Sequence, residues 1–211
     1  MDLNLGYTQL IIKKAREAGL LRNQLAYVLA TAWHETAHTM KPVREYGGET
    51  YLRKKSYYPY VGMGFVQLTW KRNYARASKE LGVDFVKHPR KLLEPEYSAH
   101  ILVIGSRDGW FTGKKLSDYM TLSKSDYKNA RRIINGLDKA DLIARHARDY
   151  EASLKAMGYD GAATPIPTPK PVTGQPGAKG KGVAAAGGLV ALMLALSHFY
   201  DKIHDFIAGL F

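Results

Sequence analysis

The sequence contains no cysteine, which excludes disulfide bonds and thiolate metal ligands. Acidic residues are few: 19 aspartates and glutamates stand against 31 lysines and arginines, and the formal net charge is +12. Such a surplus favours anionic partners, among them nucleic acids, cell-wall polymers and lipid head groups, or it serves solubility alone. The sign of the charge does not choose among these possibilities.

The N-terminus lacks the charged, apolar and small segments of a secretory signal peptide, so none is expected. The first 160 residues instead place apolar residues three and four positions apart, which predicts helices. We expect helices within residues 8–20, 22–40, 69–82, 94–111, 124–136 and 139–158. Residues 43–65, rich in tyrosine and glycine, predict a small strand-and-loop lobe.

Three parts are expected: a globular domain over residues 1–160, a linker over residues 161–182 and a C-terminal segment over residues 183–211. The linker is rich in proline, glycine and lysine and has no acidic residue, so it cannot bury a core. Residues 183–200 carry no formal charge. As a helix they would span roughly 27 Å, slightly less than a hydrocarbon core of about 30 Å. The segment is predicted to cross a membrane, to lie on one, or to dock onto another protein.

The stretch "WHETAH" contains the pattern H-E-x-x-H, which on a helix is typical of zinc peptidases. His34 and His38 would supply two ligands, and a third is required. The extended pattern needs glycine and histidine where the chain has Lys41 and Arg44, and Glu80 is a weak substitute. A zinc site is therefore an alternative, and no metal or other cofactor is expected.

Glu35 also has a function without a metal. It stands near the end of an apolar helix, where a carboxyl group can stay protonated and donate a proton to a leaving oxygen. That is the role of the general acid in a glycosidase. Taken alone, the position of Glu35 favours a structural role, that of a helix-end glutamate that pairs with a nearby lysine or arginine.

The segments "HET" and "GMGFVQLTWKRNY" (residues 62–74) together make the chain similar to glycoside hydrolase family 19, which includes chitinases and bacteriophage endolysins. The later "RRIING" segment is similar too, and the resemblance covers about residues 20–157. It implies a mainly α, lysozyme-like (α+β) fold and a glycosidase that requires no cofactor. The spacing around "HETAHTMKPVREYGG" is closer to that of the phage lysins than to that of the plant chitinases.

The resemblance also implies roles for individual residues. Glu35 matches the general acid. Glu45 matches the second carboxylate by its spacing in the phage lysins, and Glu49 is the alternative. Thr69 matches the hydroxyl that helps to hold the attacking water. Gln67, Asn73 and Asn135 match substrate-binding groups. Ala37 stands where the chitinases often have threonine, which puts chitin in doubt as the substrate.

The expected function is an endolysin that cleaves the β-1,4 bonds of peptidoglycan glycan strands with inversion and thereby lyses a host cell. The alternatives are a chitinase, the zinc peptidase, and an envelope-binding protein that has lost activity. Nucleic acid is not an expected partner, because no DNA-binding motif is present. The protein is expected to be a monomer that waits in the host cytoplasm and acts in the periplasm or cell wall. The basic linker and residues 183–200 would provide contact with anionic membranes.

Lys179 and Lys181 precede the apolar run and would keep the enzyme domain on the cytoplasmic side of a membrane. Two hypotheses reconcile this orientation with a target in the cell wall. The segment either holds the enzyme at the inner membrane until a pore or depolarisation releases it, or inserts later into an outer membrane.

Overall fold

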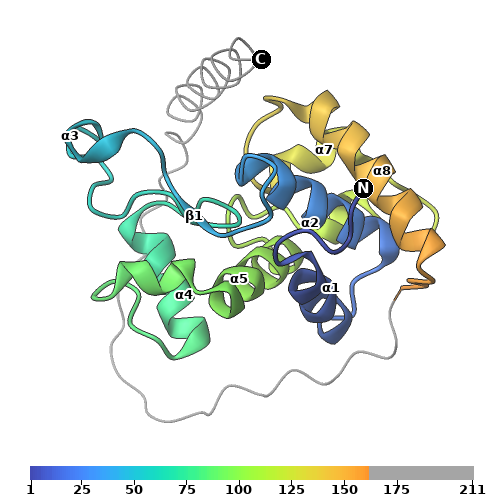
Figure 1. The fold of residues 1–211 in the computed structure, drawn as a ribbon, viewed down its shortest axis with the longest axis horizontal. Helices are drawn as coiled ribbons and strands as arrows, with labels where there is room; N and C mark the ends of the chain where they lie inside the picture. The colour runs from blue at the N-terminus through green and yellow to red at the C-terminus, as the bar shows by residue number, and fades with distance from the viewer. Residues whose placement is uncertain (162–211) are drawn as a thin grey trace, which may run out of the picture. The chain divides into compact units, whose positions relative to one another are not determined.

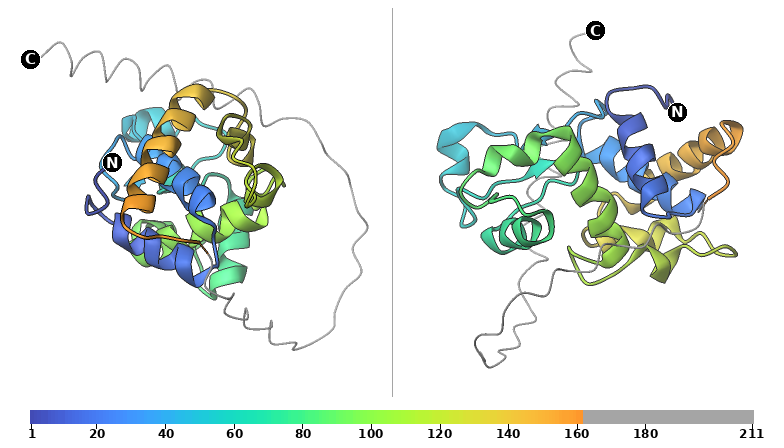
Figure 2. Two further views of the ribbon diagram at one scale, coloured as in Figure 1. Left: turned by 90° about the vertical axis from the view of Figure 1, so that its right-hand side faces the viewer. Right: turned by 90° about the horizontal axis from the view of Figure 1, so that it is seen from below.

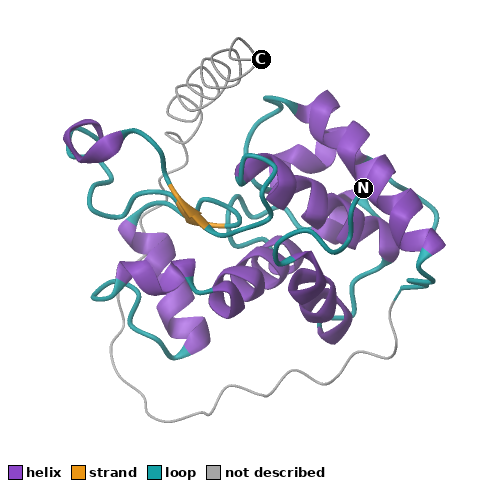
Figure 3. Ribbon diagram, in the orientation of Figure 1, coloured by secondary structure: helices purple, strands orange, loops and turns teal. Residues whose placement is uncertain are grey.

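The computed structural model describes residues 1–161, which lie within one compact unit, Met1–Pro165. This part of the chain is mainly helical with a small strand-and-loop lobe, as the sequence predicted (Figure 3). The predicted C-terminal segment and all but the first residue of the predicted linker lie outside the described residues. Among residues 1–161, no helix is both long and apolar enough to span a membrane.

The secondary structure follows the predicted order along the chain (Figure 1). Its elements are α1 (Thr8–Glu17), α2 (Arg22–Glu35), β1 (Val43–Arg44), α3 (Gly48–Leu52), β2 (Met63–Gly64), α4 (Lys71–Leu81), the 3-10 helix η1 (Pro89–Leu93), α5 (Pro95–Asp108), α6 (Leu116–Tyr119), α7 (Tyr127–Ala130), the 3-10 helix η2 (Arg131–Ile133) and α8 (Ala140–Ala156).

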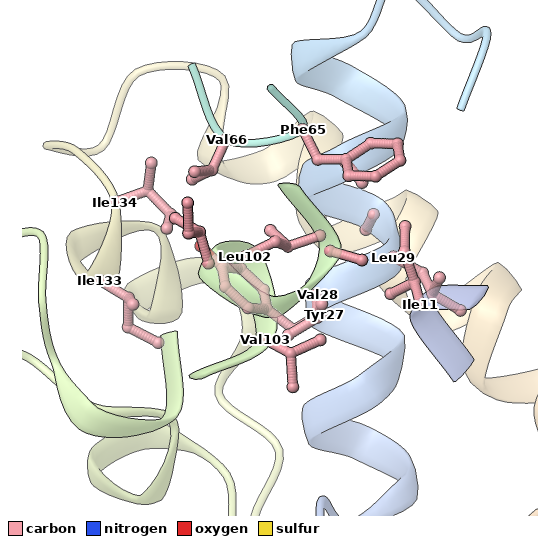
Figure 4. Packing of buried hydrophobic residues seen from close by; sticks show 14 of the residues in the cluster. Ile11, Tyr27, Val28, Leu29, Phe65, Val66, Leu102, Val103, Ile133 and Ile134 are labelled. Carbon is pink, nitrogen blue, oxygen red and sulfur yellow. The ribbon is translucent and has the colours of Figure 1, made fainter. Parts of the chain in front are cut away.

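Helix α2 is the centre of the domain. All its residues from Leu25 to Ala32 are buried, so it is covered on every side, as its apolar sequence predicted. It packs lengthwise against α8 and also contacts α1 and α5 (Figures 1 and 2). Figure 4 shows side chains of α2, including Tyr27 and Leu29, within a cluster that also contains Leu102 of α5.

The small lobe is built on a short antiparallel pair, β1 and β2, in which Val43 pairs with Gly64. Helix α3 lies between the two strands in sequence, where only loops were expected. Phe65 and Val66, directly after β2, belong to the same buried cluster as α2 (Figure 4). The lobe is therefore fixed to the helical part of the domain through a shared core.

Two predicted helices differ from the structure. The helix expected over residues 22–40 ends at Glu35, because Ala37 and His38 adopt left-handed backbone conformations (φ 49° and 65°) that cannot continue an α-helix. The hydroxyl of Thr36 donates to the carbonyl of Ala32 (2.7 Å) and accepts from the amide of Met40 (3.1 Å), which fixes this ending. The helix expected over residues 124–136 is only the short pair α7 and η2.

Candidate functional site

Glu35 is the last residue of α2, and its side chain is 19% exposed. Its Oε1 atom accepts a hydrogen bond from Nη1 of Arg131 at 2.9 Å. The carboxyl group therefore pairs with an arginine, as the structural interpretation of Glu35 predicted, and its surroundings are not the purely apolar environment that the catalytic interpretation assumed. They contain a charged partner 96 positions away in the sequence.

Arg131 has an exposed fraction of 4% and begins the 3-10 helix η2. Its Nε atom donates to the carbonyl oxygen of Asp138 (3.2 Å), and its own carbonyl accepts from the amide of Asn135 (2.9 Å). The guanidinium group therefore connects the end of α2 to the loop between η2 and α8. Sequence reasoning did not single out this residue.

The early end of α2 bears directly on the zinc alternative. Two histidines four positions apart share a face only within a continuous helix, and His38 lies three residues beyond Glu35. His38 instead stacks on the indole of Trp33, with ring centroids 4.5 Å apart. Burial lowers the pKa of His34. Within residues 1–161, no group of three or more histidine, aspartate or glutamate side chains is arranged to hold a metal ion.

Glu45 follows β1 and is 4% exposed. Oε1 accepts from the hydroxyl of Tyr57 at 2.6 Å, and Oε2 accepts from the amide of Gly62 at 2.8 Å. Burial raises the pKa of Tyr57, and the neighbouring Glu45 raises it further, so the phenol remains a donor. Both carboxylate oxygens are thus held in fixed directions, and Glu45 is joined to the first glycine of the segment 62–74.

Glu49 lies in α3 and is exposed. It accepts from the hydroxyl of Tyr58 (2.6 Å) and from Nη2 of Arg44 (2.9 Å), and the guanidinium of Arg53 lies 3.7 Å away. The hydrogen bond from Tyr58, followed by that from Arg44, lowers the pKa of Glu49. This carboxylate therefore belongs to a surface cluster of charges.

Gln67 stabilises the backbone of its own lobe. Its Nε2 atom donates to the carbonyls of Val43 (2.9 Å) and Gly64 (3.0 Å), which braces β1 and β2. A Cβ atom on Gly62 would lie 2.8 Å from Oε1 of Gln67, so the glycine leaves room for this side chain. These contacts fix the side chain of Gln67 against its own lobe, and its sugar-binding role stays a prediction.

Thr69 and Asn73 continue the same hydrogen-bonded segment. The hydroxyl of Thr69 donates to the carbonyl of Gln67 (2.9 Å), and Nδ2 of Asn73 donates to the carbonyl of Thr69 (2.7 Å). A hydroxyl oxygen that donates its proton still has lone pairs to accept one from water. Thr69 was expected near the start of the following helix, but α4 begins at Lys71.

Asn135 lies in the loop after η2, where its Oδ1 atom accepts from the amide of Gly136 at 2.8 Å. The preceding residue, Ile134, is buried in the same cluster as Val66, which precedes Gln67 (Figure 4). One core therefore anchors both segments that carry predicted substrate-binding groups.

Two connected groups result. Hydrogen bonds join Glu35, Arg131 and Asn135 into one group. The other group consists of Gln67, Thr69 and Asn73, which are bonded in sequence, and of Glu45, which is bonded to Gly62 of the same segment. The first belongs to the helical part and the second to the strand-and-loop lobe. Six of these seven residues were predicted from the sequence, and Arg131, the partner of Glu35, was missed. Tyr57, the partner of Glu45, was missed as well. Arg131 and Tyr57 are partners of the carboxylates because both side chains are buried. The sequence contains no signal for this burial beyond the position of Arg131 before "IING".

Comparison with solved structures gives a likeness in fold. Chitinase C from Streptomyces griseus HUT6037 has a TM-score of 0.50 and 16% sequence identity, over 77% of this chain and 75% of that one. A point mutant of chitinase C has a TM-score of 0.45 and 17% identity, over 69% and 77% of the two chains. No protein-family model and no curated protein matches the sequence. The domain therefore has a chitinase-like fold, the fold that the resemblance to family 19 implied.

Proposed function

We propose that the protein is a glycoside hydrolase that cleaves β-1,4 bonds in the glycan strands of bacterial peptidoglycan, in the manner of a phage endolysin. The observation that carries the proposal is the position of Glu35 at the end of the central helix, held by Arg131 on a chitinase-like fold. A buried helix provides a rigid base for a proton donor. The resemblance of "HET" and residues 62–74 to family 19 supports the same role.

In the proposed mechanism, Glu35 donates a proton to the leaving glycosidic oxygen. Glu45 accepts a proton from the attacking water, which the hydroxyl of Thr69 helps to hold. Water attacks from the opposite face of the sugar ring, so the anomeric configuration inverts. The two hydrogen bonds to Glu45 keep it oriented as an acceptor. Because Glu45 is buried, the exposed Glu49 is tested as the alternative base.

A chitinase is the second candidate, and the fold likeness to chitinase C favours it. The two substrates share the β-1,4 bond between amino sugars and differ in the lactyl and peptide groups of peptidoglycan. Hydrolysis of soluble chitooligosaccharides without hydrolysis of sacculi would favour the chitinase.

The test is the release of new reducing ends from purified sacculi by the full-length protein, with and without a strong chelator. Release that persists with the chelator supports a glycosidase that needs no metal. Loss of activity with the chelator and its return with zinc would restore the peptidase alternative. Purified sacculi are preferable to cells because a chelator by itself disturbs an outer membrane.

A role in host lysis, with residues 183–211 in contact with a membrane, is part of the proposal. Deletion of these residues is expected to change the timing of lysis and the membrane association of the protein. If both remain unchanged, the proposed role of the C-terminal segment is wrong, while the proposed hydrolase activity is unaffected.

A further inference from the structure

The positive charge of the described domain is concentrated in one part of the chain. Residues 41–93 contain 12 lysines and arginines against four aspartates and glutamates. The remaining described residues contain 15 against 13. The small lobe and the helix that follows it therefore carry a surplus of eight charges, and the rest of residues 1–161 carries a surplus of two.

Helix α4 presents four of these cations on one face. Lys71 and Lys79 lie eight positions apart, which is close to two helical turns, and Arg72 and Arg76 lie one turn apart. All four are exposed, whereas Tyr74 and Ala77 on the opposite side are buried. We refer to Lys71, Arg72, Arg76 and Lys79 as the α4 cationic face.

The first three of these cations are placed unfavourably for the helix itself, whereas Lys79 lies in the last turn, where a cation is favourable. The first turn of α4 contains no acidic residue, so Lys71 and Arg72 lie at the positive end of the helix dipole. Arg72 and Arg76 are like charges at positions i and i+4, which repel. Each effect costs a few tenths of a kcal/mol. Departures from local helix rules are expected where a surface has a function.

None of the four cations forms an ion pair with another residue of the described part of the chain. The ion pairs within residues 1–161 involve other lysines and arginines. Arg76 is held against Trp110, with its guanidinium 5.2 Å from the ring centroid and Nη1 donating to the carbonyl of Trp110 (3.3 Å). The other three side chains project from the helix without an anionic partner in this domain.

The α4 cationic face continues directly from the candidate site. Lys71 is two residues after Thr69, and Asn73 of the first turn donates to the carbonyl of Thr69. From Lys71 to Lys79 the helix axis advances roughly 12 Å. An extended polymer bound at Thr69 can therefore run along this face and meet several cations in succession.

We infer that the α4 cationic face binds the free carboxylates of the peptide stems attached to the glycan strand, and thereby selects peptidoglycan over neutral chitin. The inference rests on the proposed function and specifies its substrate. Chitin carries no anionic group, so these cations would contribute nothing to its binding. Peptide stems project from the strand at regular intervals and present carboxylates within reach of long lysine and arginine side chains.

The experiment measures co-sedimentation with purified sacculi and with insoluble chitin. It uses the full-length protein with Glu35→Gln, so that cleavage does not remove the ligand. The test variant adds Lys71→Gln, Arg72→Gln and Lys79→Gln, and leaves Arg76 in place because it packs on Trp110. The matched control instead adds Lys13→Gln, Arg148→Gln and Lys155→Gln, which are exposed and outside residues 41–93. Both triple variants lose the same charge.

The α4 variant is expected to bind sacculi roughly 5- to 50-fold more weakly, as three weak ion pairs imply, and the control within about twofold of the parent. High salt should reduce this difference, since the contacts are exposed. Binding to chitin should be equal for all proteins. Sacculi whose stem carboxylates have been converted to amides should bind the parent as weakly as unmodified sacculi bind the α4 variant.

Three results would overturn the inference. Equal losses in the two triple variants would mean that only total charge matters. An unchanged affinity of the α4 variant for sacculi would show that the α4 cationic face does not bind the peptide stems. Binding that survives amidation but disappears when phosphate-containing polymers are extracted from the sacculi would assign the face to phosphate. Release of reducing ends by the wild-type protein is measured separately, so failure of the proposed hydrolase activity is distinguishable from failure of this inference.

Discussion

Arg131 is a buried side chain that connects two distant parts of the candidate site. It is preceded by Ala130 and followed by a second arginine, Arg132, which is exposed. A sequence pattern cannot tell which of two adjacent arginines is buried, because that depends on how η2 packs against α2. The motif "IING" predicted that this region contributes to the site, and Arg131 makes hydrogen bonds with both Glu35 and Asn135.

Replacement of Arg131 by methionine is expected to destabilise the protein by about 3 kcal/mol, at the lower end of values for broken buried ion pairs, because Glu35 is partly exposed. The free energy of unfolding in urea measures the effect. In the double variant Arg131→Met with Glu35→Gln, the loss should be smaller than the sum of the single losses. Strict additivity would show that the two side chains do not interact.

The choice of Glu45 over Glu49 as the catalytic base rests on its spacing from Glu35 in the sequence and not on exposure, because Glu45 is buried and Glu49 is exposed. Glu45→Gln should reduce kcat by roughly 10²- to 10⁴-fold, the range for general acid–base groups. Glu49→Gln removes an exposed carboxylate from a surface cluster and should leave kcat within about threefold. Initial rates of reducing-end release from sacculi measure both. The reverse order would transfer the role to Glu49.

The helices show what the sequence could and could not predict. Periodic apolar residues located α1, α4, α5 and α8, and Gly82 ends α4 in the left-handed conformation expected of a C-terminal glycine. The predicted end of α2, at residue 40, lies about five residues beyond the observed end at Glu35. Ala37 and His38 rarely adopt positive φ, and here the contacts of Thr36 and the stacking of His38 on Trp33 impose it. Local contacts within residues 32–40, which apolar periodicity does not reveal, therefore set the position of Glu35 at a helix end.

Strand β2 depends on a close approach between Gly64 and α5. Gly64 has φ 85°, and an added Cβ would lie 2.5 Å from Oγ of Ser98, which accepts from the amide of Phe65. Gly82 has φ 65° with nothing near its Cβ position. Gly82→Ala should therefore cost only backbone strain, about 1–2 kcal/mol, and Gly64→Ala should cost more.

Unfolding in urea measures both glycine variants, and Gly82→Ala is the matched control for the strain. An equal loss of stability in the two variants would show that the lobe accommodates a methyl group at Gly64. The contact between β2 and α5 would then not restrict the segment 62–74.

The whole domain should lose stability in mild acid. Burial lowers the pKa values of His34, His100 and His146 below their usual 6.5. Between those lowered values and pH 6.5 the unfolded chain binds more protons than the folded one, so the free energy of unfolding falls as the pH decreases through this window.

His100 lies in α5, outside both groups of the candidate site, so it isolates the effect of protonation on stability. In His100→Gln, the free energy of unfolding should depend less steeply on pH below about 6.5 than in the wild type. Parallel curves for the two proteins would mean that His100 is protonated equally easily in the folded and unfolded states.

The measurement that tests the proposed function most directly is the hydrolysis of purified sacculi by Glu35→Gln beside the wild type. Glutamine keeps an oxygen that can accept from Arg131 but cannot act as a proton donor of the same strength. The wild type should release new reducing ends in the presence of a chelator, and the variant should do so roughly 10²- to 10⁴-fold more slowly while remaining folded. A folded variant with near wild-type activity would show that Glu35 is not the general acid.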